Sequence, residues 1–360
     1  MNKQSRKTIS IINLPALVNN FKQIAKLAQK SETIAVIKAN GYGHGAIEIA
    51  KHLSAHAPAF AVAFIDEAIK LREAGITLPI LIMEGAFSCD DYAVAIQQNF
   101  WMMLHTEQQV DWLLRTTPSY SGKLWLKLDT GMNRLGIKPN DIERIISKLP
   151  PEQLNTLVLC THFSNADELD NPKTALQIQT FERINNNHSF KTSLANSAGI
   201  LNFPQSHGDY NRLGIALYGS SPIPIKDLPV KLTPVMSLQS TIIGLRELQI
   251  GESVGYGENW QAKRPSIIAT IAIGYGDGYP RNAKNGAPVF VNGHIAPLVG
   301  RVSMDMLTID VTDIEKVTLG DTVELWGENL SVETVAEYLD TINYELLTRV
   351  SDRVPRVYVE

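Results

Sequence analysis

Short apolar segments alternate with amphipathic ones through the first two-thirds of the chain, and this alternation constrains the fold more than any other feature. The apolar segments predict eight buried strands, at 34–39, 59–64, 78–83, 101–105, 123–129, 156–162, 191–196 and 212–219. Continuous apolar strands that alternate with helices are typical of a parallel sheet covered on both faces. Eight such units predict a (β/α)8 TIM barrel. Its seventh helix, near 197–202, is expected to be short.

Beyond residue 230 the pattern changes to strand-like segments without long helices between them. These segments lie at 236–245, 266–275, 287–293, 306–312 and 321–327. Turn signals such as Asn292-Gly293 separate them. One helical segment is expected late in the chain, near 331–349. The sequence therefore predicts two closely packed domains, an α/β barrel over residues 1–230 and an all-β domain over residues 231–360.

Composition excludes several classes of protein. The formal net charge of the 360 residues is −4 and no block of like charges occurs, so a nucleic-acid partner is not expected. No stretch approaches the roughly 20 apolar residues of a membrane span, and the basic start is not followed by a continuous apolar region. The two cysteines, Cys89 and Cys160, argue for a reducing compartment. A cytoplasmic protein without a membrane partner is expected.

Lys38 ends the first predicted strand and is followed by a glycine-rich turn. Active sites of barrels lie at the C-terminal ends of the strands, so this lysine is expected in one. An amine on an apolar strand is partly desolvated, which keeps it nucleophilic and suits it to Schiff-base chemistry. Tyr42 offers a hydroxyl at the same rim. The alternative is a lysine whose amine reaches solvent from a strand end, and this segment alone does not decide between the two.

Other strand ends place polar residues at the same rim. They are Lys127, Asp129 and Arg134 after the fifth strand, His162 after the sixth, Asn196 and Ser197 after the seventh, and Arg212 at the start of the eighth. Singly, each has an ordinary structural interpretation, but five strands with such ends favour an active site. No phosphate-binding P-loop occurs. No set of His, Cys and carboxylate residues has the spacing of metal ligands, so no metal is expected.

The segment KANGYGHG, which begins at Lys38, resembles the pyridoxal-lysine signature of alanine racemases. The resemblance continues through segments 127–136, 161–167, 195–199, 212–219, 254–257, 272–281 and 300–305. It implies a barrel followed by a β domain, with pyridoxal 5′-phosphate as cofactor. It also implies a homodimer whose active sites are shared between subunits. The implied activity is interconversion of L-alanine and D-alanine, which supplies D-alanine for peptidoglycan.

Racemisation removes the α-proton from one face of an amino acid and returns a proton to the other face, so it needs two acid–base groups. Lys38 is expected on one face, and by resemblance Tyr256 serves the other from the partner subunit. The resemblance places His162 against that tyrosine and Arg212 behind His162, facing the pyridine nitrogen. Arginine cannot accept the ring proton, so the cofactor is a weaker electron sink, which favours racemisation over transamination.

The resemblance also assigns the groups that bind phosphate and substrate. The phosphate positions match Tyr42, Ser197, Gly214 and Ile215. Arg134 matches the position that binds the substrate carboxylate, while Met304 and Tyr275 match residues of the substrate entry. Lys127 stands where many alanine racemases carry a carbamylated lysine that orients the arginine. Asp305 is interpreted as a pocket residue or a simple cap.

One position departs from the expected pattern. Some family members have a phosphate-binding tyrosine directly before an Arg-Val-Pro-Arg segment, where this chain has Asp352. Three other functions remain open at this stage. They are a racemase of serine or a broader range of amino acids, a non-catalytic carrier of pyridoxal phosphate, and a cofactor-independent Schiff-base aldolase.

Overall fold

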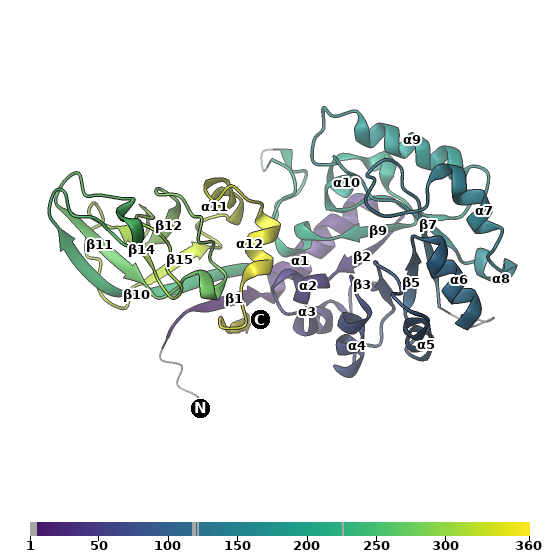
Figure 1. Cartoon of the computed structure of the whole chain (residues 1–360), viewed down its shortest axis with the longest axis horizontal. Helices are drawn as coiled ribbons and strands as arrows, with labels where there is room; N and C mark the ends of the chain where they lie inside the picture. The colour runs from purple at the N-terminus through teal and green to yellow at the C-terminus, as the bar shows by residue number, and fades with distance from the viewer. Residues whose placement is uncertain (1–5, 117–119, 121, 225–226) are drawn as a thin grey trace.

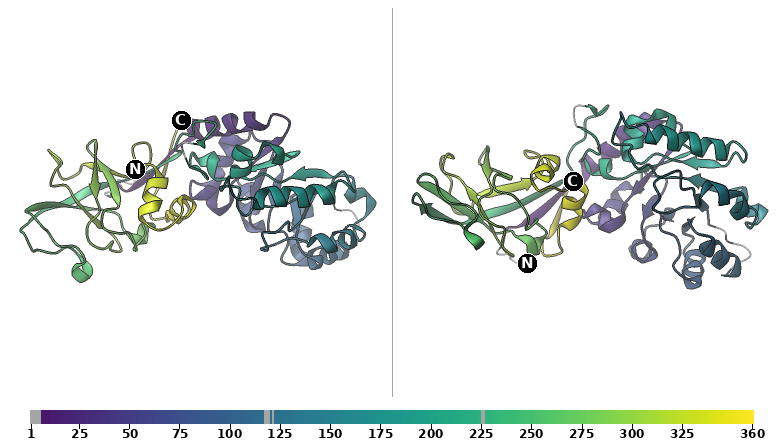
Figure 2. Two further views of the ribbon diagram at one scale, coloured as in Figure 1. Left: turned by 90° about the horizontal axis from the view of Figure 1, so that it is seen from above. Right: turned by 45° about the horizontal axis from the view of Figure 1, so that its top comes forward.

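The computed structural model describes residues 6–116, 120, 122–224 and 227–360, which form an eight-stranded parallel barrel joined to a second, mostly antiparallel β domain. The molecule is elongated, with the barrel at one end and the β domain at the other (Figures 1 and 2). Helix α12 lies at the junction between them (Figure 1).

Every predicted strand of the barrel is present, and each is shorter than its apolar segment. The strands are β2 (Glu32–Val36), β3 (Phe60–Val62), β4 (Ile80–Ile82), β5 (Trp101–Leu104), β6 (Leu124–Lys127), β7 (Val158–Cys160), β8 (Lys191–Ser193) and β9 (Tyr210–Leu213). They pair in parallel in the order β8-β7-β6-β5-β4-β3-β2-β9. The remaining gap is bridged just beyond β8, where Arg212 N donates to the Ala195 carbonyl at 3.0 Å. The predicted barrel is therefore confirmed.

Amphipathic helices surround the barrel, because their apolar faces cover the outside of the sheet. They are α1 (Leu14–Ala25), α3 (Ala46–Leu53), α4 (Ile65–Glu73), α5 (Cys89–Gln97), α6 (Glu107–Thr116), α7 (Ile142–Ile146), α8 (Pro151–Leu154), α9 (Lys173–Asn185) and α10 (Ser197–Asn202). Short 3₁₀ turns add η1 (Lys26–Ala28), η2 (Pro139–Asp141) and η3 (Pro204–Ser206). The helix expected to be short is α10, with 6 residues.

Two predicted strands extend too far in sequence. Strand β2 ends at Val36, so Lys38 does not end a strand but begins the short helical turn α2 (Lys38–Tyr42). Strand β9 ends at Leu213, and the 3₁₀ turn η4 (Ile215–Tyr218) replaces the second half of the expected strand. Both errors have one cause, since a buried apolar run does not distinguish a strand from a buried helical turn.

The second sheet contains strands from both ends of the chain. It consists of β1 (Ile9–Asn13), β10 (Met236–Leu248), β11 (Ser266–Ile271), β12 (Pro288–Val291), β13 (His294–Pro297), β14 (Leu307–Asp310), β15 (Thr322–Trp326) and β16 (Arg356–Val359). Strand β1 lies between β10 and β16, antiparallel to the first and parallel to the second. Three of these strands, β1, β13 and β16, were not predicted. Strands β1 and β16 are short and pair with distant parts of the chain, whereas β13 follows β12 across the Asn292-Gly293 turn and is mostly exposed, so it has no apolar run.

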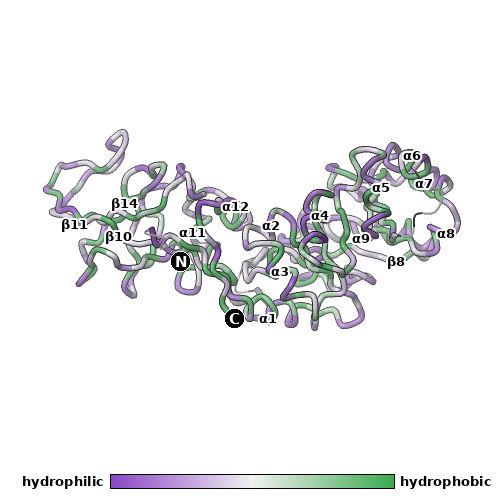
Figure 3. The backbone as a smooth tube through the Cα atoms, turned by 90° about the horizontal axis from the view of Figure 1, so that it is seen from below, coloured by the Kyte–Doolittle hydropathy of each residue, from purple (hydrophilic) through white to green (hydrophobic). Residues whose placement is uncertain are grey.

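The single late helix that was expected is in fact two, α11 (Val332–Tyr338) and α12 (Asn343–Arg349). Asp340, with a φ of 54°, breaks the helix between them. One cluster of buried apolar side chains runs from the barrel into the β domain. Figure 3 likewise shows hydrophobic stretches in both parts of the chain. The two domains therefore share a continuous core and are closely packed, as expected.

Within the described residues, no helix is long and apolar enough to cross a membrane. The same residues hold no group of three or more His, Cys, Asp or Glu side chains placed to bind a metal ion. Cys89 and Cys160 are both free thiols.

Candidate active site

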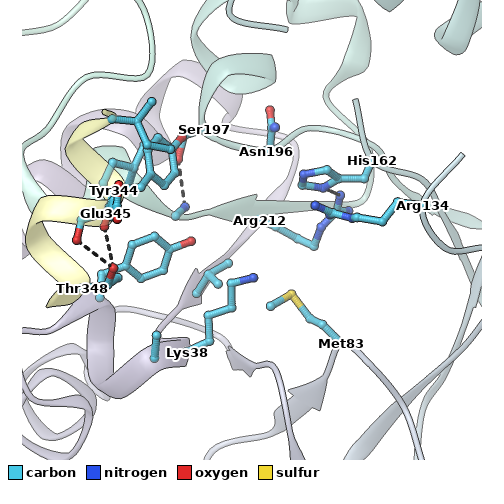
Figure 4. A pocket seen from close by; sticks show the side chains of 16 residues that line it. Lys38, Met83, Arg134, His162, Asn196, Ser197, Arg212, Tyr344, Glu345 and Thr348 are labelled. Carbon is cyan, nitrogen blue, oxygen red and sulfur yellow. Dashed lines mark hydrogen bonds between the residues drawn. The ribbon is translucent and has the colours of Figure 1, made fainter. Parts of the chain in front are cut away.

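A pocket of about 500 Å³ lies at the C-terminal ends of the barrel strands, where α12 packs over them. Most of the residues singled out in the barrel sequence line it: Lys38, Tyr42, Arg134, His162, Asn196, Ser197, Arg212, Gly214 and Ile215. Figure 4 shows the Lys38 amine directed into this space, with Met83 beside it and Arg134, His162 and Arg212 together on one side. The barrel therefore brings residues from five separate segments to one rim.

A left-handed turn presents Lys38 and Tyr42 to the pocket. The φ angles of Ala39, Asn40, Gly41 and Tyr42 are 52°, 53°, 63° and 49°. For residues with a side chain this conformation costs roughly 1–2 kcal/mol each. His44 stabilises the turn from below, since its Nδ1 lies 3.1 Å from the Gly41 carbonyl oxygen and 2.9 Å from that of Tyr42. Strain of this kind is found where a structure holds a functional group in place.

Arg212 is 5% exposed, and its two terminal nitrogens are used within the barrel. Nη1 donates to the Ser193 carbonyl at 2.9 Å, and Nη2 donates to the carbonyl of Thr161 at 2.6 Å. Nη2 also lies 3.5 Å from Nδ1 of His162. Among the described residues its Nε donates to no acceptor, so that N–H is available to a ligand. Burial, and then the positive charge of Arg212, hold the pKa of His162 well below its ordinary value.

Neutral donors surround the opposite end of the pocket. Ser197 Oγ accepts from the backbone N–H of Gly214 at 2.9 Å, which turns the hydroxyl hydrogen away from that contact. Burial raises the pKa of Tyr42 to about 12, so its phenol stays protonated and can donate. A Cβ on Gly214 would lie 2.9 Å from the Tyr42 hydroxyl oxygen, so the close approach requires glycine. Such a set of N–H and O–H donors suits a phosphate group.

Lys127 lies beneath the pocket and is 9% exposed. Together with Lys38, Arg134, His162 and Arg212, it lines a second, much smaller cavity of about 40 Å³. Burial lowers the pKa of the Lys127 amine, and the nearby Arg212 and Arg134 lower it further. Burial and two neighbouring guanidinium groups thus disfavour the charged form of this amine relative to a lysine in water.

Three of the expected site residues lie elsewhere in the same chain. Tyr256, Tyr275 and Met304 are on the β domain and do not line the pocket. Tyr256 belongs to the turn η6 (Tyr256–Glu258) and is 68% exposed, and Met304 is 53% exposed. Tyr275 begins the turn η7 (Tyr275–Asp277). Asp305 accepts from Arg353 at 2.7 Å and also lies outside the pocket.

The distance to Tyr256 can be judged from strand β10. Its first residue, Met236, pairs with Ile12 near the barrel, and its last, Leu248, pairs with Ser266 at the far end of the β domain. A strand of 13 residues spans roughly 40 Å at about 3.3 Å per residue. Figure 1 shows the far end of β10 at the end of the molecule away from the barrel. Tyr256 comes eight residues after that strand end and does not line the Lys38 pocket of its own chain.

The apparent departure at Asp352 is explained by a different residue. Asp352 has a 99% exposed side chain near Arg356 and is absent from the pocket. Tyr344 of α12 lines the pocket instead, with its ring centroid 6.2 Å from that of Tyr42. Ile342, Glu345 and Thr348 line the same side. The sequence carried no signal for this side, because α12 reaches the barrel only through packing of the two domains.

These groups fit pyridoxal 5′-phosphate. Lys38 offers an amine to the aldehyde, and Arg212 offers the ring nitrogen an N–H that has no acceptor among the described residues. The donors around Ser197 and Gly214 are placed for the phosphate. Tyr42 and Tyr344 add two phenols at the phosphate end. Glu345 also lines this pocket, but its carboxylate already pairs with Arg349 and accepts a hydrogen bond from Thr341.

Comparison with known proteins covers nearly the whole chain. A family model for the N-terminal domain of alanine racemase matches residues 12–222, and one for the C-terminal domain matches residues 235–358. The alanine racemase of Alteromonas mediterranea is 46% identical over 353 residues, which are 98% of this chain and 99% of that protein. These matches support alanine racemisation and give no support to a broader racemase.

Solved structures agree with the fold. The biosynthetic alanine racemase from Pseudomonas aeruginosa superposes with a TM-score of 0.94 at 41% identity, covering 99% of this chain and 100% of that one. The alanine racemase from Bartonella henselae, solved with covalently bound pyridoxal phosphate, gives a TM-score of 0.90 at 31% identity over the same shares of the two chains.

Proposed function

The chain belongs to the alanine racemase family, and on that premise we propose that it interconverts L-alanine and D-alanine with pyridoxal 5′-phosphate. The observation that carries the proposal is the pocket at the barrel mouth. Lys38, Arg212 and the donors around Ser197 converge there on a space that suits this cofactor.

Each part of the cofactor has a matching group in this chain. Lys38 would bind it covalently through its amine, Arg212 would face the ring nitrogen, and Tyr42, Tyr344, Ser197 and the backbone of Gly214 and Ile215 would hold the phosphate. When bound, the cofactor supplies an electron sink that acidifies the α-proton of an amino acid. Because Arg212 cannot accept a proton, it leaves that sink weak, which limits side reactions.

Two groups move the proton. The Lys38 amine serves the face of the amino acid that lies toward the barrel strands. We assign the opposite face to Tyr256 of the partner subunit. His162 supports that role, because its Nδ1 faces Arg212 at 3.5 Å and its Nε2–H is then free to donate to a phenolic oxygen. Such a hydrogen bond favours the ionised phenol that must accept the proton.

We also propose a homodimer with shared sites. Tyr256, Tyr275 and Met304 do not line the pocket of Lys38 in their own chain, and the exposed Tyr256 and Met304 suit contact with another copy. Arg134 would bind the substrate carboxylate, since a guanidinium pairs with a carboxylate through two hydrogen bonds. The partner's Met304 and Tyr275 would narrow the entry to small amino acids. We place the enzyme in the cytoplasm and its product in peptidoglycan synthesis.

Two measurements test the proposal. Borohydride reduction of the purified protein should leave a pyridoxyl group on Lys38, found by peptide mass spectrometry. Loss of optical rotation should then be followed for alanine, serine and larger amino acids, and alanine should react fastest. A colourless protein without the Lys38 adduct would contradict the cofactor, and equal rates for all substrates would contradict the small pocket. Restored growth of a D-alanine-requiring strain would support the role in peptidoglycan.

A further inference from the structure

The left-handed turn that carries Lys38 is closed by its own backbone hydrogen bonds. Gly41 N donates to the Ile37 carbonyl at 2.9 Å, and Gly43 N donates to the Ala39 carbonyl at 3.0 Å. The N–H of Ala39 at the start of the turn and the C=O of Gly43 at its end lie outside this ladder, and each is bound by a side chain from another element. In any helical turn the free N–H end is partly positive and the free C=O end partly negative.

Glu67 of α4 binds the start of the turn. Its Oε1 accepts from Ala39 N at 2.6 Å, and its Oε2 accepts from Ala63 N at 2.8 Å. The carboxylate therefore links the residue directly after Lys38 to the end of the neighbouring strand β3. A charged acceptor at the positive end of a turn is the favourable arrangement.

Arg356 of β16 binds the end of the turn. Its Nε donates to the Gly43 carbonyl at 2.6 Å, while its Nη2 donates to the Val350 carbonyl at 2.9 Å. The guanidinium is only 12% exposed, so it is held in one geometry. Contact is close here, because a Cβ on Gly43 would collide with the carbonyl oxygen of Leu347 in α12. The C-terminal segment of the β domain therefore packs directly on the lysine turn.

We propose that Glu67 and Arg356 are paired positioning residues, which hold the two ends of the Lys38 turn and thereby fix Lys38 and Tyr42 for the cofactor. Neither side chain lines the pocket of about 500 Å³, so both act through the backbone. The two charged side chains bind opposite ends of a turn that has unfavourable φ angles. Loss of either side chain would therefore let the turn relax toward ordinary conformations. This inference rests on the proposed use of pyridoxal phosphate.

The test measures cofactor affinity rather than turnover. Apoenzyme of Glu67→Ala and of Arg356→Met is titrated with pyridoxal phosphate and followed by the visible absorbance of the bound cofactor. Each variant should bind about tenfold more weakly than the wild type, as expected for loss of a charge-assisted hydrogen bond. The conservative variants Glu67→Gln and Arg356→Lys keep one acceptor or one donor and should recover part of the loss.

Two controls separate positioning from general stability. Glu73→Ala removes an exposed carboxylate from the same helix α4 and should bind the cofactor as the wild type does. The thermal midpoint of every apoprotein is recorded alongside. The inference would be overturned if cofactor affinity fell only in those variants whose thermal midpoint also fell, and in proportion to it. It would also be overturned if affinity stayed within about twofold of wild type in all four variants. If the wild type itself shows no Lys38 adduct, the proposed function fails instead. If Ala or Met variants do not fold, the Gln and Lys pair decides by the same criteria.

Discussion

Nη2 of Arg212 lies 3.5 Å from Nδ1 of His162, and the other partners of the guanidinium are backbone carbonyls and the Ser193 hydroxyl. An arginine can only donate, so this contact favours the tautomer in which Nδ1 faces Arg212 without a proton and the imidazole proton lies on Nε2. Burial disfavours a second proton on the ring. His162 is therefore a neutral donor whose free N–H points away from Arg212, which is the arrangement that a tyrosine arriving from another chain requires.

The first prediction concerns sharing of the site. Tyr256→Phe should slow racemisation by at least about a hundredfold while cofactor binding is unchanged, because only one proton-transfer group is lost. Lys38→Ala should abolish covalent cofactor binding. When the two inactive chains are mixed, heterodimers should regain one intact site and up to about a quarter of wild-type activity for the whole mixture. Subunit exchange is checked by native mass spectrometry, and exchange without recovered activity would contradict shared sites.

Tyr344 should bind the phosphate, and Asp352 should not. Tyr344→Phe removes a phenol whose pKa is raised by burial, so a neutral donor is lost. We expect about tenfold weaker binding of pyridoxal phosphate, from fluorescence titration of the apoenzyme. Asp352→Asn is the matched control. Its side chain is 99% exposed, so water screens its 3.5 Å ion pair with Arg356, and the substitution should change affinity by less than about twofold. The reverse pattern would restore Asp352 as the position of interest.

Lys127 should carry a carbamate. The neutral form of the amine adds carbon dioxide and releases a proton, and the lowered pKa of Lys127 makes that form easier to reach. The product is an anion near Arg134 and Arg212. Isotope-labelled bicarbonate should give a carbamate signal in the NMR spectrum of the wild type but not of Lys127→Ala. That variant should have a KM for alanine at least about tenfold higher, partly restored by acetate. A wild-type spectrum without the signal would show that Lys127 acts as a plain amine.

His44 should make stability depend on pH. Burial lowers the pKa of His44 from the ordinary 6.5 to about 4. Between these two pH values the unfolded chain is protonated at His44 and the folded chain is not. Stability is therefore complete above the ordinary pKa and falls as the pH drops from 6.5 toward 4. The loss from this group amounts to about 3 kcal/mol, at about 1.4 kcal/mol per pKa unit.

The measurement compares urea unfolding of the wild type and of His44→Gln across this pH range. Gln keeps a donor for the turn but does not titrate, so the variant should be less stable at neutral pH yet lose less stability on acidification. Parallel pH curves for the two proteins would show that His44 is not the source.

Much of the barrel follows from local pattern. Strand β5 lies where an apolar run predicts it, because a strand buried on both faces requires such a run. The helix α10 is also short, as expected. Lys38 is the instructive error. The run of apolar residues before it continues past the end of β2, and only the φ angles of Ala39 and Asn40 reveal a turn in place of a strand.

By itself, the sequence determined which groups of the barrel meet at its mouth. Lys38 and His162 come just after β2 and β7 and Arg212 lies in β9, and the parallel strands of a barrel bring these positions to one rim. Tertiary structure alone decided what covers that rim. Tyr344 and Arg356 lie more than three hundred residues after Lys38, and packing of the β domain brings the first into the pocket and the second onto the lysine turn. Such contacts depend on how two cores meet, which no local periodicity records.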